Sequence, residues 1–152
     1  MALPNIFTET VAEDIVRRIN SLSPDTAPQW GKMNVSQMLA HCNVTYEMVY
    51  ERKHPKPKGF MKLILKLMVK NMVVGEKPFK RNNPTAPAFK VVDNKDFETE
   101  KARLIDHIQK TRKLGEKEFD GRESHSFGKL SGHQWNNMFY KHLDHHLVQF
   151  GK

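Results

Sequence analysis

Two histidines near the C-terminus have the spacing of metal ligands. Residues 131–150 read SGHQWNNMFYKHLDHHLVQF, in which His142 and His146 stand at positions i and i+4. On a helix such residues have Cβ atoms about 5–6 Å apart, so both imidazoles can reach one ion, with bonds of about 2.0–2.1 Å if the ion is zinc. A histidine-rich helix also produces this spacing by chance. The alternative is two separate histidines, one bonded to a backbone carbonyl and one solvated.

The segment that carries this pair has the start and stop signals of a helix. Ser131 and Gln134 match a capping box, and Gly151 follows as a stop. The residues expected on its inward face recur at steps of three and four; they are Trp135, Met138, Phe139, His142, His146 and Gln149. This face begins aromatic and ends in imidazoles, each of which would cost about 1–3 kcal/mol if left unpaired inside the protein.

A third histidine lies on another predicted helix, much earlier in the chain. Residues 34–52 begin with a second capping box and carry a broad apolar face. At 100° per residue, His41 lies within about 60° of Met38 and Thr45, so it is at the edge of that face or inside it. A lone histidine there is more often a hydrogen-bonded core residue, and it becomes a candidate ligand because of the distant pair. Cys42 points about 100° away and is interpreted as a core residue.

Length and composition predict a single all-α domain over residues 1–152, located in the cytoplasm. The chain has one cysteine, no secretory segment and no uncharged apolar run long enough to span a bilayer. Strand patterns are scarce. Five helical segments are expected, four of which form an antiparallel bundle. Residues 75–94 contain three prolines and are expected to cross over its outside. A connection of this length is often a rim or lid over a site.

The basic charge of the chain is confined to one segment. Residues 52–81 hold ten Lys or Arg against one acid, for a net charge of +9, while the rest of the chain is net −1. Within this segment, residues 59–74 are apolar nearly all round except for Lys62, Lys66 and Lys70. The preferred interpretation is a buried bundle helix whose lysines reach solvent. The second interpretation is a homodimer contact. A homodimer is also expected, because the helix carries more apolar surface than a surface helix needs. An amphipathic helix on an anionic membrane is the third.

Other partners are not expected from this composition. The basic segment lacks interleaved exposed aromatic residues and a helix-turn-helix pattern, so nucleic-acid binding is not predicted. Stable membrane association is not expected either. Among the remaining polar residues, His145 lies about 100° from His146 and is interpreted, with Asp144, as a supporting or surface residue, although either is an alternative ligand. His125 is expected to be a loop residue without function, or a supporting residue near the site. His107 is expected to be solvated.

Taken together, these motifs resemble a known superfamily. Trp30 followed by N-V-S-Q-M-L-A-H, ending in His41, is similar to the second-helix signature of the DinB-like (YfiT-like) superfamily. The ending K-H-L-D-H-H-L-V-Q-F resembles its last helix, and HSFGKL…QW…YKHLDHHLVQFG resembles one branch of uncharacterised members. The likeness covers about residues 30–41 and 125–151. The chain departs from the commonest ending, since Leu147 and Val148 stand where arginine and glycine usually precede the glutamine.

The resemblance implies that His41, His142 and His146 bind one divalent ion inside an antiparallel four-helix bundle, with zinc or nickel favoured and iron as a further candidate. Three nitrogen ligands leave a position open to water or a small-molecule substrate, as in catalytic zinc sites. Superfamily relatives include transferases that use low-molecular-weight thiols such as bacillithiol or mycothiol. A thiol S-transferase, or a related metal-assisted transferase, isomerase or hydrolase, is therefore the first hypothesis. A non-enzymatic metal or small-ligand binding bundle is the alternative, and a vestigial site is the third. No catalytic residue is assigned.

Overall fold

The computed structural model describes residues 2–51 and 53–152, which form helices and no strand. The only strand-like pairing in these residues is an isolated antiparallel bridge between Glu123 and Lys129. The long helices are α1 (Glu9–Asn20), α2 (Val35–Tyr50), α5 (Phe97–Leu114) and α7 (Gly132–Gln149). The short elements are α3 (Gly59–Ile64), a π-helical turn (Leu65–Val69), α4 (Lys70–Val74), a 3-10 turn (Pro87–Phe89) and α6 (Glu116–Phe119). The prediction of an all-α fold is confirmed.

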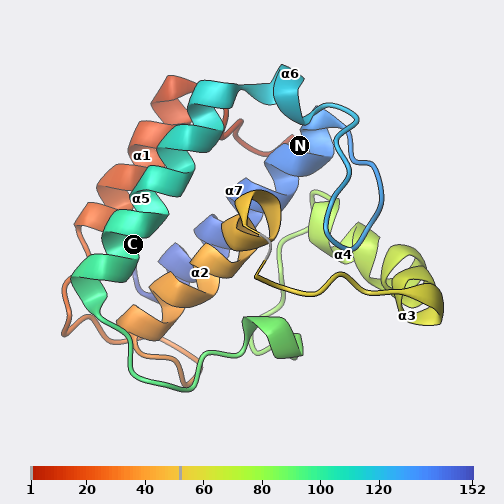
Figure 1. Ribbon diagram of the computed structural model, residues 1–152. Coiled ribbons are helices and arrows are strands. Elements are labelled where there is room, and N and C mark those ends of the chain that lie inside the picture. The colour runs from red at the N-terminus through yellow and green to blue at the C-terminus, as the bar shows by residue number, and fades with distance from the viewer. Residues whose placement is uncertain (1, 52) are drawn as a thin grey trace.

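The four long helices pack on one another around a shared core (Figure 1). Helix α5 contacts α1 and α2, and α7 contacts the same two helices. Aromatic rings fill the centre, where Phe139 stacks on Tyr46 with ring centroids 5.1 Å apart and on Trp135 at 5.5 Å. Because aromatic side chains bury about 150–250 Å² each, this cluster supplies a large part of the hydrophobic stabilisation. The core therefore fixes α7 against α2, the two helices that carry the histidines.

The helices that carry the histidines begin at strong side-chain caps. The side chain of Asn34 accepts a hydrogen bond from the backbone N–H of Gln37, and the Gln37 side chain accepts one from the backbone N–H of Asn34. Ser131 and Gln134 form the same reciprocal pair at the start of α7. Each cap contributes about 1 kcal/mol by satisfying backbone N–H groups that the helix itself leaves unpaired. Both predicted capping boxes are confirmed.

The helical segment 59–74, made of α3, the π-helical turn and α4, lies outside the core. Only its last part, α4, packs against a long helix, which is α7, and Figure 1 shows α3 standing apart from α1 and α5. Val74 is its one buried residue. The preferred interpretation of a buried bundle helix is therefore wrong. The physical reason is that the four long helices already cover one another's apolar faces, which leaves no apolar surface for α3.

Helix α7 holds the C-terminal end of this segment through buried polar side chains. Asn137 donates a hydrogen bond to the carbonyl of Val74 at 3.0 Å. The Lys141 ammonium donates to the carbonyls of Met72 at 2.8 Å and Gly75 at 2.5 Å. Burial lowers the pKa of Lys141 to about 8. These bonds satisfy carbonyls that the end of α4 leaves unpaired, so the segment is tied to the core at one end.

Residues 75–94 connect α4 to α5 with no regular element other than the 3-10 turn. Their irregular backbone agrees with the three prolines, each of which removes a backbone donor. The 3-10 turn contacts α2, and this contact brings the connection to the histidines. None of the helices in the described part of the chain has the length and apolar character that a bilayer crossing requires.

Candidate metal centre

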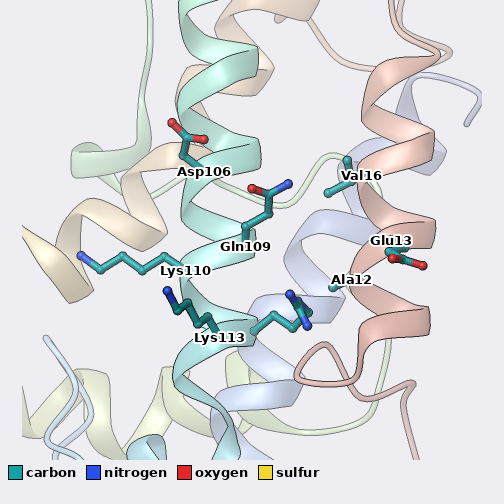
Figure 2. A pocket seen from close by; sticks show the side chains of 8 residues that line it. Ala12, Glu13, Val16, Asp106, Gln109, Lys110 and Lys113 are labelled. Atoms are coloured by element: carbon teal, nitrogen blue, oxygen red, sulfur yellow. The ribbon is translucent and has the colours of Figure 1, made fainter.

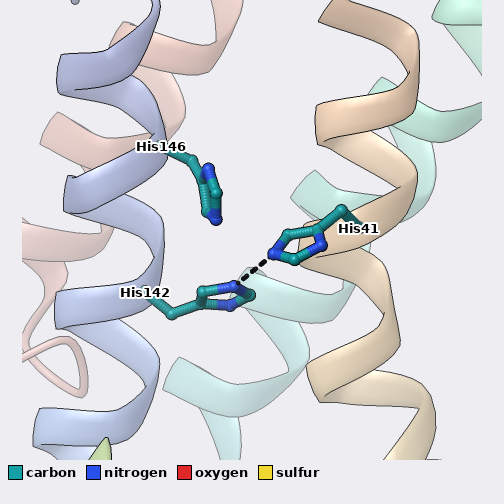
Figure 3. Close-up of side chains that lie close together, drawn as sticks. All are labelled: His41, His142 and His146. Atoms are coloured by element: carbon teal, nitrogen blue, oxygen red, sulfur yellow. Dashed lines mark hydrogen bonds between the residues drawn. The ribbon is translucent and has the colours of Figure 1, made fainter. Parts of the chain in front are cut away.

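Three imidazoles from two helices point toward one another in the interior. His142 and His146 come from adjacent turns of α7 and His41 comes from α2 (Figure 3). One ring nitrogen of each lies within 4.8 Å of those of the other two. The Nε2 atoms of His41 and His142 are 2.9 Å apart, and the ring centroids of His41 and His146 are 4.5 Å apart. The three histidines that the resemblance implies as ligands thus converge, while metal binding itself stays a prediction.

The outer ring nitrogens of His41 and His146 are held by groups that only accept hydrogen bonds. His41 Nδ1–H donates to the backbone carbonyl of Phe89 at 2.8 Å, and His146 Nδ1–H donates to Oε1 of Gln149 at 2.8 Å. A neutral imidazole carries one proton, so a ring that is protonated at Nδ1 has its Nε2 lone pair free. Partners of this kind orient metal-binding histidines and raise their basicity as ligands. Both rings therefore present an acceptor nitrogen to the centre.

The orientation of Gln149 is itself fixed by the loop before α2. Its amide Nε2 donates to the carbonyl of Trp30 at 2.7 Å, so its oxygen faces His146. Gly31 makes room for this contact, because a Cβ atom at that position would lie 2.5 Å from Nε2 of Gln149. The backbone of Gly31 has φ +85°, a conformation that side chains disfavour. The glycine at position 31 thus supports the ring orientation of His146.

His142 has a partner that can change its role. Its Nδ1 lies 3.0 Å from the hydroxyl of Thr45, which can donate or accept. Because the single proton of neutral His41 is on Nδ1, the contact between the two Nε2 atoms requires His142 Nε2–H to donate, with Thr45 donating to His142 Nδ1. If the hydroxyl rotates, His142 can carry its proton on Nδ1 and donate it to Thr45. All three Nε2 atoms are then acceptors without any change of charge.

Burial keeps the three imidazoles neutral at pH 7. Loss of solvent contact lowers the pKa of His41 and brings that of His146 to about 3. The pKa of His142 falls well below its ordinary value, first because of burial and then because of the neighbouring imidazoles. Metal ions bind the neutral form of histidine, since a proton and an ion compete for the same nitrogen. The three imidazoles are therefore already in the neutral form that binds metal, and no proton has to be removed first.

The 3-10 turn packs against the histidines. The Phe89 ring lies 5.4 Å from that of His41 and 5.8 Å from that of His142, centroid to centroid. His41 and His146 are buried, whereas His142 keeps partial contact with solvent. The connection 75–94 therefore lies against one side of the centre.

The neighbouring polar residues of α7 are directed elsewhere. His145 packs edge-on against Trp30 and Phe79, with centroid distances of 5.9 and 5.6 Å, and lines a pocket of about 170 Å³ outside the centre. Asp144 forms an ion pair with Arg18 at 2.9 Å. Neither belongs to the converging group in the described chain. Their interpretation as supporting or surface residues agrees with these contacts.

Two other histidines do not reach the centre. His125 contacts the hydroxyl of Ser126 and the carbonyl of His54, so it holds a loop in place. The expectation of a solvated His107 is wrong: this ring stacks on Tyr46 at 5.3 Å and its Nδ1 bonds Oδ1 of Asn43 at 2.9 Å. Its position beside the apolar stripe of α5 is sufficient to cover most of its ring once α2 packs there.

A larger hollow, of about 550 Å³, lies between α1 and α5 and is separate from the histidines (Figure 2). It is lined by Ala12, Glu13, Val16, Asp106, Gln109, Lys110, Arg112 and Lys113. Its side chains carry both charges, and no pair of them forms a metal-ligating group in the described residues. This hollow is a solvated groove between two helices and does not extend the centre.

Sequence reasoning missed the three groups that orient the rings. Gln149 stands three residues after His146, so helical spacing places it on the same face as the ring it orients, and that spacing is a signal that could have identified its role. Thr45 shares a face of α2 with His41 but contacts His142 of α7, so its role depends on the packing of the two helices. The carbonyl of Phe89 gives no such signal, because every residue has one and only the fold brings this one to His41.

The fold and the centre together define an all-helical protein with three convergent histidines as a candidate metal site. A family model described as "Protein of unknown function (DUF1569)" matches residues 6–152. The chain therefore belongs to the DUF1569 family, which is part of the DinB-like superfamily. The predicted superfamily is confirmed, and the particular branch stays a prediction. Comparisons with curated proteins and with solved structures found no match.

Proposed function

We propose that His41, His142 and His146 bind one divalent ion, with zinc or nickel favoured and iron as a further candidate. The observation that carries this proposal is the outward bonding of all three Nδ1 atoms, which turns the Nε2 atoms toward a common centre. Imidazole suits each of these metals. Three ligands leave a position for water or a small molecule.

The proposal includes the antiparallel four-helix bundle with a crossover at residues 75–94. It is supported by the contacts of α1 and α2 with both α5 and α7, and by the position of the 3-10 turn against α2. In that arrangement the ion would join α2 to α7. Since it binds only the folded protein, it would stabilise the fold by mass action.

We further propose that the protein is a metal-dependent thiol S-transferase, or a related transferase or hydrolase, acting on a small-molecule substrate. Membership of the DinB-like superfamily and the open ligand position support this. A bound divalent ion would supply a Lewis acid that lowers the pKa of a thiol or water molecule. In the described chain the converging group consists of histidines alone. A thiol, with an ordinary pKa near 8–9, needs less help from a carboxylate base than water does, which favours thiol transfer over hydrolysis.

The second candidate function is a metal or small-ligand binding protein without catalysis. The same histidine geometry supports it, because in the described residues the converging group holds histidines and no carboxylate. The two candidates differ in one measurable respect. Only the enzyme transfers a thiol to an electrophile faster than the metal-free protein does.

The test is a thiol-transfer assay on protein purified without a histidine tag and loaded with zinc or nickel. Bacillithiol and mycothiol are the thiols, and a fluorogenic alkylating electrophile reports the transfer. We expect turnover with the loaded protein, loss of turnover in His142→Ala, and no loss in the matched control His133→Ala, whose side chain is 54% exposed. Stoichiometric metal without turnover for either thiol would favour the binding protein.

A further inference from the structure

The helical segment 59–74 exposes a continuous set of large apolar side chains. Six of them are at least half exposed: Phe60 (77%), Met61 (56%), Leu63 (50%), Leu67 (68%), Met68 (76%) and Met72 (50%). We call this set the apolar face of the segment. Large exposed apolar patches are uncommon on monomeric soluble proteins and mark surfaces that bind something.

The same segment lies within the basic part of the chain. Lys62, Lys66 and Lys70 recur along it at intervals of four residues, and residues 52–81 carry a net charge of +9. Lys66 is exposed, and the pairing of Lys62 with Glu123 at 3.5 Å is at a solvent-exposed position. Exposed ion pairs contribute little, so Lys62 and Lys66 remain available to an external anionic surface, while Lys70 is half-buried. The occupant of the apolar face must therefore tolerate, or complement, a strong positive charge.

The fold presents this face without covering it. Among the described helices, α3 and the π-helical turn contact each other and α4 joins them to α7. The bonds from Asn137 and Lys141 hold the α4 end. The segment is thus held by the core at its α4 end (Figure 1). Its apolar face is open to solvent over the rest of its length.

Two occupants compete for this face: a second copy of the chain and an anionic lipid surface. A symmetric dimer would place two identical patches together, and with them two segments of charge +9. The rest of the chain is nearly neutral, at net −1, so its overall charge does not offset that repulsion. An anionic bilayer supplies both missing features, since its interfacial region takes apolar side chains and its headgroups attract lysines.

We propose that the segment 59–74 docks the protein on anionic membrane surfaces, with the apolar face inserted between headgroups and the lysines at the headgroup level. The segment lies in the plane of the membrane, because no described helix is able to cross it. This departs from the expectation of no stable membrane association, in which the preferred interpretation was a helix covered by its own chain. The proposal is independent of the metal centre.

The test uses flotation of the full chain with large unilamellar vesicles of phosphatidylcholine alone or with 30% phosphatidylserine. The apolar variant is Leu67→Gln with Met68→Gln, and the charge variant is Lys66→Glu with Lys70→Glu. The first pair is exposed, so circular dichroism should be unchanged. Matched controls elsewhere on the surface are Val92→Gln, at a side chain 87% exposed, and Lys32→Glu with Lys113→Glu.

We expect the protein to float with the anionic vesicles and not with the neutral ones, and to detach as sodium chloride rises from 50 to 300 mM. Each double variant should lower the partition coefficient at least tenfold, while the controls bind as the unmodified protein does. Failure to float with anionic vesicles at 50 mM salt overturns the proposal. Light scattering that shows a dimer, converted to monomer by Leu67→Gln with Met68→Gln, would assign the face to a second copy and overturn it equally.

Discussion

The histidine centre buries polar side chains, whereas the helical segment 59–74 exposes apolar ones. In the centre, polar rings are buried and each Nδ1 has a partner. In the segment, large apolar side chains are exposed, and Phe60 and Met68 keep more than three-quarters of their surface in solvent. A fold that minimised its own free energy would do neither, because burying polar groups and exposing apolar ones both have a cost.

In the two proposals, each region interacts with something outside the chain. A divalent ion would compensate the desolvation of the buried imidazoles, and an anionic bilayer would remove the exposed methionines, leucines and phenylalanine from water. The two proposed interactions are chemically unrelated, so each can be tested without the other.

The largest effect on stability should come from the core that supports the centre. Phe139→Ala removes a ring that is 0% exposed and stacked on Tyr46, and should lower the free energy of unfolding by about 3–5 kcal/mol. Met68→Ala, at a position 76% exposed, should change it by less than about 0.5 kcal/mol. Urea denaturation measures both. Equal losses in the two variants would mean that the segment is part of the cooperative core.

A smaller effect should follow from adding metal. Zinc that binds only the folded state should raise the free energy of unfolding by about 2.7 kcal/mol when free zinc is a hundred times the Kd. The gain should disappear in His146→Ala and persist in Leu67→Gln with Met68→Gln. Thermal denaturation at buffered zinc concentrations checks this. A gain that survives His146→Ala would place the ion elsewhere.

Removing the partner of one ring should weaken metal binding without removing a ligand. Gln149→Met keeps the side-chain length but leaves His146 Nδ1 without its acceptor. Loss of such an orienting group lowers metal affinity by about 10–100-fold. Competition with a chromophoric chelator gives the affinity, and Gln134→Met, at the cap of α7, is the control for general damage to the helix. Unchanged affinity in Gln149→Met would show that this bond does not orient the ring.

Acid should destabilise the metal-free protein through the same rings. Because burial lowers the pKa of His41, His142 and His146 in the folded state, the unfolded chain binds more protons below its own pKa of about 6.5. The contribution of the three neutral rings to the stability of the fold is thus fully present above pH 6.5. It is lost as the pH falls from there, toward about 3 for His146. Each ring that stays neutral contributes a slope of about 1.4 kcal/mol per pH unit.

Urea denaturation between pH 6.5 and 5 measures this slope in the absence of metal. His146→Gln removes one of these rings and should reduce the slope by about 1.4 kcal/mol per pH unit. Met68→Ala should leave the slope as it is, since the segment 59–74 contains no histidine. The lowered pKa of Glu47 acts below its ordinary value of about 4.5 and does not enter this window. A slope that is identical in His146→Gln would mean that His146 is not buried as a neutral ring.

The sequence predicted the elements of the site better than their surroundings. Helical periodicity and capping boxes located α2 and α7, since both depend on neighbours along the chain. The inward position of His142 and His146 followed from the same periodicity. The Phe89 carbonyl depends on a contact between residues 48 positions apart, which local pattern does not encode.

The location of the segment 59–74 was not predicted from the sequence. Its apolar residues, which surround the helix on nearly all sides, indicated burial, and burial against the chain itself was the preferred interpretation. The apolar residues of the segment do not by themselves specify which surface would cover them. Only the packing of α1, α2, α5 and α7 on one another shows that the covering surface is not theirs. For the same reason His107, beside an apolar stripe, was expected in solvent and lies against Tyr46.

The most direct test of the central claim is the metal content of protein purified without a histidine tag. After equilibration with zinc and gel filtration, inductively coupled plasma mass spectrometry should find one zinc per chain in the unmodified protein and in His133→Ala. It should find none retained in His142→Ala or His146→Ala. A full equivalent of tightly bound zinc in His146→Ala would contradict the assignment of His41, His142 and His146 as the ligands, and His145 would be the first replacement to test.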